Sequence, residues 1–60
     1  MKQENGSILC VKCISNIGYE ASLTIGKTYK ARRGQFGALC VWDNENELYG
    51  YPDDLFEIVT

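Results

Sequence analysis

Three cysteines are the residues whose type and spacing come closest to those of a chemical site. Cys10 and Cys13 have the spacing of a zinc knuckle or a redox pair, and Cys40 stands alone further along the chain. A structural zinc site needs four ligands, and the chain has no histidine to add to three thiols. A redox pair needs a helix N-terminus to lower a thiol pKa, whereas the surrounding ILCVKCI is a strand pattern. We therefore expect no metal site and no cofactor, and interpret the cysteines as small apolar side chains in a reducing, cytoplasmic setting.

Two further motifs are typical of catalytic or phosphate-binding sites but lack the partners that such sites require. The segment GKT over residues 26–28 matches the end of a phosphate-binding loop, but the first glycine of that motif would fall at Ala21. The following residues also predict a strand where the motif needs a helix. Asp53 and Asp54 are adjacent carboxylates, and a place at the start of a helical turn explains both. Since a catalytic triad of the usual kind needs histidine, we expect no catalytic residue and no enzymatic activity.

The composition predicts one small globular domain. Of the 60 residues, 45% are apolar and 23% are charged, which is close to the average for folded proteins. No apolar run approaches the roughly 20 residues that a membrane span needs, so no membrane association is expected. We expect a flexible N-terminal tail over residues 1–6 and a single domain over residues 7–60.

Short apolar and β-branched segments separated by turn residues predict an all-β fold. We expect strands over residues 7–14, 28–32, 38–43, 47–51 and 56–59. One tight helical turn over residues 52–55 precedes the last strand. Five strands in so short a chain favour a small, strongly bent barrel, because closure removes the sheet edges. The alternation directs Leu9, Val11 and Cys13 to the core, as it does Tyr29 and Ala31.

The segment 43–47 predicts a hairpin turn in which Asn46 adopts a left-handed conformation. In that register Asp43 pairs with Glu47 and Val41 lies opposite Tyr49. A two-residue loop would shift this register, so the pairing between residues 38 and 51 stays open at this point.

Four segments together resemble small Src-homology-3-like (SH3-like) barrel proteins of uncharacterised bacterial and phage types. LTIGKTYKA resembles the turn and second strand of such barrels, and YPDDLFEIV resembles their ending. VKCISN lies before these two segments, and VWDNENE lies between them. The resemblance covers residues 8–59 and implies a five-stranded SH3-like barrel with a short 3-10 turn before its last strand. It implies no single function, because such barrels bind proteins, peptides and nucleic acids. The aromatic segment that binds polyproline in related domains is not present here.

Surface recognition remains as the expected activity, namely that of a non-catalytic protein-interaction module that binds a partner protein or itself. Exposed aromatic and large apolar residues are typical binding anchors. The candidate contacts are Tyr19, Phe36, Trp42, Leu48 and Tyr49. The sequence leaves open whether Trp42 is exposed or part of the core.

The alternative is a nucleic-acid-binding barrel that uses a local basic segment. Its candidate phosphate contacts are Lys27, Lys30, Arg32 and Arg33, with Trp42 or Phe36 stacking on bases. The net charge of −2 disfavours this alternative, because nucleic-acid affinity depends on neutralising phosphates. A third hypothesis is an acidic mimic that occupies a partner's nucleic-acid site through the carboxylates of residues 45–57.

Overall fold

A computed structural model describes residues 8–59 and contains five strands and two short 3-10 segments. In chain order they are β1 (Leu9–Cys13), β2 (Thr28–Arg33), η1 (Gln35–Gly37), β3 (Leu39–Trp42), β4 (Leu48–Tyr51), η2 (Asp53–Leu55) and β5 (Phe56–Ile58). All five expected strands and the tight turn before the last one are present, with ends that differ by one or two residues. The tail expected over residues 1–6 lies outside the described residues.

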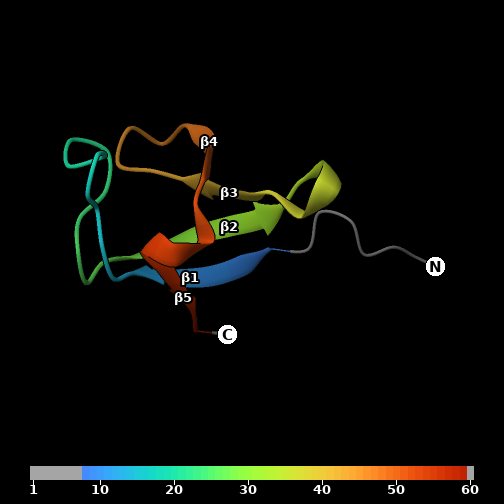
Figure 1. The fold of residues 1–60 in the computed structure, drawn as a ribbon, viewed down its shortest axis with the longest axis horizontal. Coiled ribbons are helices and arrows are strands. Elements are labelled where there is room, and N and C mark those ends of the chain that lie inside the picture. Colours follow the sequence, from blue (N-terminus) through green and yellow to red (C-terminus); the bar gives the residue numbers. More distant parts are fainter. Residues whose placement is uncertain (1–7, 60) are drawn as a thin grey trace.

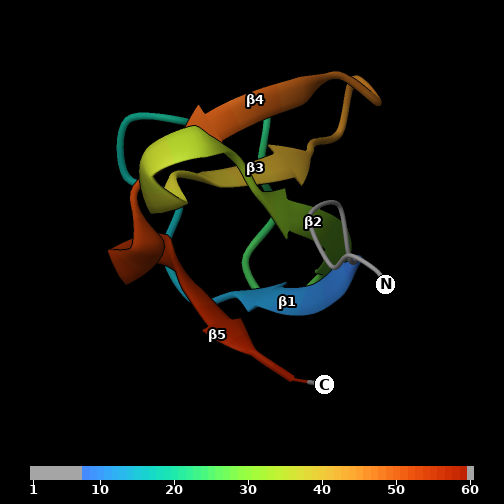
Figure 2. The ribbon, with the colours of Figure 1, turned by 90° about the vertical axis from the view of Figure 1, so that its right-hand side faces the viewer.

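The strands form one antiparallel sheet in the order β4-β3-β2-β1-β5. Figure 2 shows this sheet curling from β4 through β3, β2 and β1 to β5. The sheet is not closed into the expected barrel: β4 and β5 are its two edges, and the ladders of residues 8–59 do not join them. The physical reason is that β5 has only three residues, and all of its ladder pairs are made with β1.

The core lies inside this curl and is built from alternate residues of the strands. Val11, Cys13, Ala31 and Val41 have no exposed surface. The other buried apolar side chains are Leu23, Tyr29, Leu39, Tyr51, Leu55 and Phe56, with Leu9 and Tyr19 packed against them. The inward direction of alternate residues in the first two strands is therefore confirmed. Tyr49 pairs with Val41 and so lies on the same face, as the expected register predicts, but 57% of its surface is exposed because it lies on the edge strand β4.

The hairpin between β3 and β4 has the expected register. Val41 pairs with Tyr49, and the N–H of Asp43 donates to the carbonyl of Glu47 over 3.0 Å. Asn46 has φ 62°, in the left-handed region that asparagine tolerates. The turn chemistry therefore fixes which side chains of β3 and β4 share a face.

The two ends of the curled sheet carry different loops (Figure 1). The long loop over residues 14–27 and the β3–β4 hairpin lie at one end, where the N–H of Asn44 donates to the carbonyl of Ser22 over 2.8 Å. The segment η1 lies at the opposite end. Within residues 8–59, the structure contains no helix with the length and apolar character needed to cross a bilayer.

Candidate functional site

A groove with a volume of about 590 Å³ brings Trp42 together with Lys27 and Lys30. We call it the lysine–tryptophan groove. Lys27 lies in the turn before β2, Lys30 lies within β2, and Trp42 ends β3. The remaining lining residues are Ile8, Thr28, Tyr29, Asp43 and Asn46. One surface therefore combines two cationic side chains with aromatic and aliphatic ones.

Strand register explains why these side chains meet. Lys30 pairs with Cys10 of β1, and the β2–β3 register, continued by one residue beyond the pair Ala31 and Val41, places Trp42 beside Lys30. Trp42 pairs in turn with Leu48 of β4, which is 37% exposed. Since the core residues occupy the inner face of these strands, this row lies on the outer face of the sheet. Trp42 itself is half-buried, so it belongs neither to the core nor to the fully exposed surface.

The two lysines differ in how they are held. The Nζ atom of Lys27 lies 5.2 Å from the centre of the Tyr29 ring and donates to Oδ1 of Asn44 over 3.3 Å. The Tyr29 hydroxyl donates to the same Oδ1 over 2.7 Å. Lys30 is exposed, and the one ion pair that the structure gives for residues 8–59 involves other side chains. The groove therefore contains one positioned ammonium group and one that is free for a ligand.

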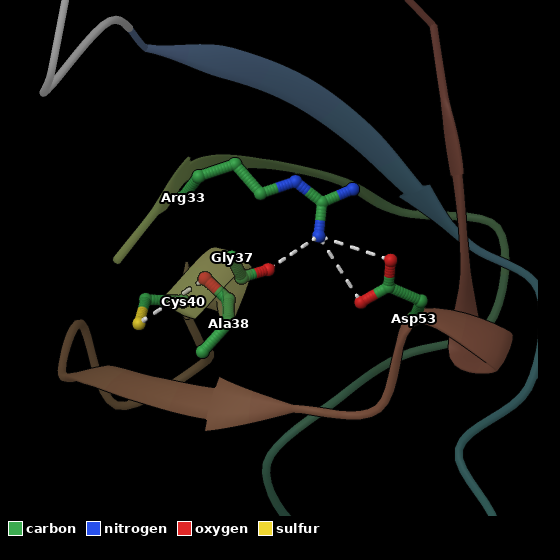
Figure 3. Close-up of polar contacts among 5 residues, drawn as sticks. All are labelled: Arg33, Gly37, Ala38, Cys40 and Asp53. Atoms are coloured by element: carbon green, nitrogen blue, oxygen red, sulfur yellow. Dashed lines mark hydrogen bonds and ion pairs between the residues drawn. The ribbon is translucent and has the colours of Figure 1, made fainter. Parts of the chain in front are cut away.

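The four basic residues of the segment 27–33 do not share one surface in the fold. Arg33 continues the inward alternation of Tyr29 and Ala31, and its Nη1 donates to a carboxylate oxygen of Asp53 over 3.0 Å and to the carbonyl of Gly37 over 3.0 Å. Figure 3 shows this guanidinium group between the loop carbonyl and the carboxylate. Arg32 lies on the outer face opposite Cys40. Arg33 therefore connects the end of β2 to η1 and η2. The basic side chains that remain for an external ligand are those of Lys27, Lys30 and Arg32.

A second hollow, with a volume of about 240 Å³, lies between the loop after β1 and the β3–β4 hairpin. We call it the tyrosine pocket. Tyr19 and Tyr49 each pack edge-on against Tyr51, with ring centroids 5.0 and 5.1 Å from it. The other lining residues are Ser22, Asp43, Glu45 and Glu47. Two of the candidate contacts, Tyr19 and Tyr49, therefore lie in this pocket and not in the groove.

Asp43 lines both hollows and is a buried polar residue next to the core, with 8% of its surface exposed. Its carboxylate accepts hydrogen bonds from the Tyr51 hydroxyl over 2.7 Å and from the N–H groups of Glu45 and Glu47 over 3.0 and 3.1 Å. Burial by itself would raise the pKa of Asp43, but these donors outweigh it and the pKa is lowered. Burial and the neighbouring carboxylate raise the pKa of Tyr51, so its hydroxyl stays a donor. Sequence reasoning missed this buried pair.

Phe36 is separate from both hollows. It lies in η1, at the opposite end of the sheet from the hairpin, and its side chain is fully exposed. Its backbone has φ 63°, which is costly for a residue other than glycine or asparagine. The fold therefore does not place the candidate contact Phe36 in the same groove as Trp42.

The cysteines lie on two faces of the sheet. Cys13 is completely buried, and this burial raises the pKa of its thiol, although the thiol also donates to the Ser15 carbonyl over 3.2 Å. Cys10 and Cys40 are half-buried free thiols. In the part of the chain that the structure describes, no three Cys, Asp or Glu side chains gather in a metal-binding arrangement.

Comparisons with protein-family models, with curated proteins and with solved structures find no match to this chain. The features of the molecule that bear on its function are therefore the two hollows and their side chains.

Proposed function

We propose that this chain is a non-catalytic protein-interaction module with the architecture of an SH3-like barrel. The strand order β4-β3-β2-β1-β5 and the 3-10 turn immediately before β5 support this architecture. The proposal includes the bacterial or phage origin that the resemblance implies. It also includes a reducing, cytoplasmic setting, which the three free thiols support.

The observation that carries the proposal is the position of Trp42 on the outer face of the sheet. It lies half-buried beside Leu48 and lines a groove that also contains Ile8, of which 54% is exposed. Large apolar side chains grouped around a tryptophan, with polar groups at the edge, are the usual composition of a binding hot spot. A partner that covers this groove would remove apolar surface from water, which favours association. A second copy of this chain is the other partner that the sequence allows.

Replacement of Trp42 tests the proposal. Twelve-residue peptides selected from a random library on the wild-type protein should bind Trp42→Ala at least about tenfold more weakly, because truncating a hot-spot residue costs about 2 kcal/mol or more. Phe36→Ala is the matched control, since it removes an exposed aromatic ring outside the groove. Fluorescence polarisation measures the affinities and circular dichroism the fold. Equal affinity for Trp42→Ala, or unfolding of that variant, would overturn the proposal.

A second candidate function is binding of single-stranded nucleic acid, and the flanking of Trp42 by Lys27 and Lys30 favours it. An aromatic ring can stack on a base while neighbouring ammonium groups neutralise phosphates. This candidate predicts binding of a fluorescent 15-nucleotide oligothymidine at 20 mM salt that weakens steeply as salt is added. Absence of binding at low salt rejects it.

A further inference from the structure

We infer that the lysine–tryptophan groove binds a short acidic segment of a partner protein in which an apolar side chain lies next to carboxylates. This inference depends on the proposed function, because it names the partner chemistry for the same groove. The groove has an apolar surface and a cationic edge. A ligand that fits both carries an apolar group next to negative charges.

The apolar surface is formed by two side chains from different parts of the chain. Trp42 is half-buried and Ile8 is 54% exposed, whereas the Tyr29 side chain belongs to the core and only 6% of its surface is exposed. The volume of about 590 Å³ falls within the range of clefts that enclose most of a small ligand. An aliphatic or aromatic side chain of the partner can therefore pack here against Trp42 and Ile8.

The cationic edge is formed by Lys27 and Lys30. Lys27 is positioned by the Tyr29 ring and by Oδ1 of Asn44, and these two contacts limit the freedom of its side chain. Lys30 is exposed and points from the outer face beside Trp42. Two ammonium groups at the edge of an apolar groove are complementary to carboxylates that flank an apolar side chain.

The distribution of charge favours a short acidic segment over nucleic acid. Arg33 is held by Asp53, so the basic segment does not form a continuous track. Asp43 lines the groove itself, and Glu45 and Glu47 follow it in the adjacent hairpin turn. A nucleic-acid strand carries one negative charge per nucleotide along its whole length and would extend from the lysines to these carboxylates. A peptide with a few carboxylates can end before it reaches them, which suits a chain whose net charge is −2.

A second copy of this chain is a poorer match for the groove. Its acidic turn η2 contains an apolar residue beside two carboxylates, but Leu55 is buried and Asp53 is bonded to Arg33. Exposing this turn would break contacts that the fold already makes. The occupant is therefore expected to come from another protein.

Three ten-residue peptides test the inference: one with a central leucine flanked by four carboxylates, one with amides in place of the carboxylates, and one with serine in place of the leucine. Isothermal calorimetry at 20 and 200 mM salt gives the affinities, and amide chemical shifts locate the binding. We expect the acidic leucine peptide to bind about tenfold more tightly than either counterpart at low salt, with a smaller difference at high salt.

Charge-neutral variants connect this preference to the groove. Lys27→Gln with Lys30→Gln should abolish the preference for carboxylates over amides, whereas Lys12→Gln should keep it. Lys12 is the matched control because it lies on β1 facing Glu57 of β5 and does not line the groove. Amide shifts confined to residues around Trp42 would support the inference, and shifts elsewhere would contradict it.

The remaining outcomes separate the inference from the proposed function. If the library peptides bind through Trp42 but carboxylates give no advantage, the inference is wrong and the protein-binding function stands. If no peptide binds, both are wrong. If oligothymidine binds through the two lysines and the peptides do not, nucleic acid is the ligand. If sedimentation shows a dimer that Lys30→Gln disrupts, a second copy occupies the groove.

Discussion

The lysine–tryptophan groove and the tyrosine pocket are both lined by Asp43. They differ in whether their polar groups already have hydrogen-bond partners within the chain. In the pocket, the Asp43 carboxylate accepts from the Tyr51 hydroxyl and from two backbone N–H groups. In the groove, the ammonium group of Lys30 is exposed and lies beside a half-buried tryptophan. The polar groups of the pocket are satisfied within the chain, whereas under the proposed function a ligand satisfies Lys30 in the groove.

This difference separates stability from recognition. Buried polar groups that are fully hydrogen-bonded hold a fold in one conformation, and removal of one partner leaves the others unsatisfied. Exposed charges beside apolar surface add little to folding but supply both affinity and selectivity to an interface. We therefore expect substitutions in the pocket to affect unfolding, and substitutions in the groove to affect binding.

The largest effect is expected for Asp43→Ala. This change leaves the Tyr51 hydroxyl and the N–H groups of Glu45 and Glu47 without their acceptor, and we expect it to lower the free energy of unfolding by about 2–3 kcal/mol. That is a large part of the stability of so small a domain. Urea denaturation measures it, with the exposed Asp54→Ala as control. A loss below about 0.5 kcal/mol would show that the pocket is not the stabilising region.

Acidification should weaken the same hydrogen bonds. The pKa of Asp43 in the folded chain lies below its ordinary value of 3.8, so the carboxylate stabilises the fold fully above that value. This stabilisation is lost as the pH falls from 3.8 through the lower pKa of the folded state. Urea denaturation between pH 6 and pH 2.5 should therefore show a steeper loss for wild type than for Asp43→Asn. Parallel curves would contradict the lowered pKa.

The smallest effect on folding is expected for Lys30→Ala. Because the side chain is exposed, the free energy of unfolding should change by no more than about 0.5 kcal/mol. Thermal and urea denaturation test this expectation. The same variant should show a weaker preference for acidic peptides, because Lys27 then remains as the cationic group at the edge of the groove. If Lys30→Ala cost as much stability as Asp43→Ala, the contrast between the two regions would disappear.

The elements that depend on local chemistry could be predicted from the sequence. Alternation of apolar residues located the strands and their inner faces, and the turn residues of segment 43–47 gave the register of Val41 with Tyr49. These features depend on residues close together in the chain, which is why single-sequence patterns carry them.

The contacts between distant segments could not be predicted in the same way. Arg33 and Asp53 are 20 residues apart, and nothing local in either segment indicates that β2 ends near η2. The open sheet edge likewise depends on how far β5 extends, which composition does not determine. One signal was present: in the expected hairpin register, Asp43 and Tyr51 share the inner face, and an aspartate before a turn commonly accepts from backbone N–H groups.

The candidate contact residues lie on separate surfaces for the same reason, because contacts between distant segments decide where loops lie. Trp42 and Leu48 lie side by side as the expected hairpin register requires, because they belong to one hairpin. Tyr19 and Phe36 lie in loops, and their positions depend on the contacts of those loops: Tyr19 packs against Tyr51, and Phe36 lies alone at the other end of the sheet. Sequence patterns identified residue types suited to binding, and the fold determined which of them share a surface.

The pairing of β1 with β5 has a consequence for how the chain is made. Residues 11–13 reach their partners only when residues 56–58 are available, so this ladder spans almost the whole described chain. Contacts of such long sequence separation slow folding, because the intervening segment must be closed first. During synthesis, the nascent polypeptide can form the β1–β2 and β3–β4 hairpins, but one side of β1 has to wait for the last strand to emerge from the ribosome.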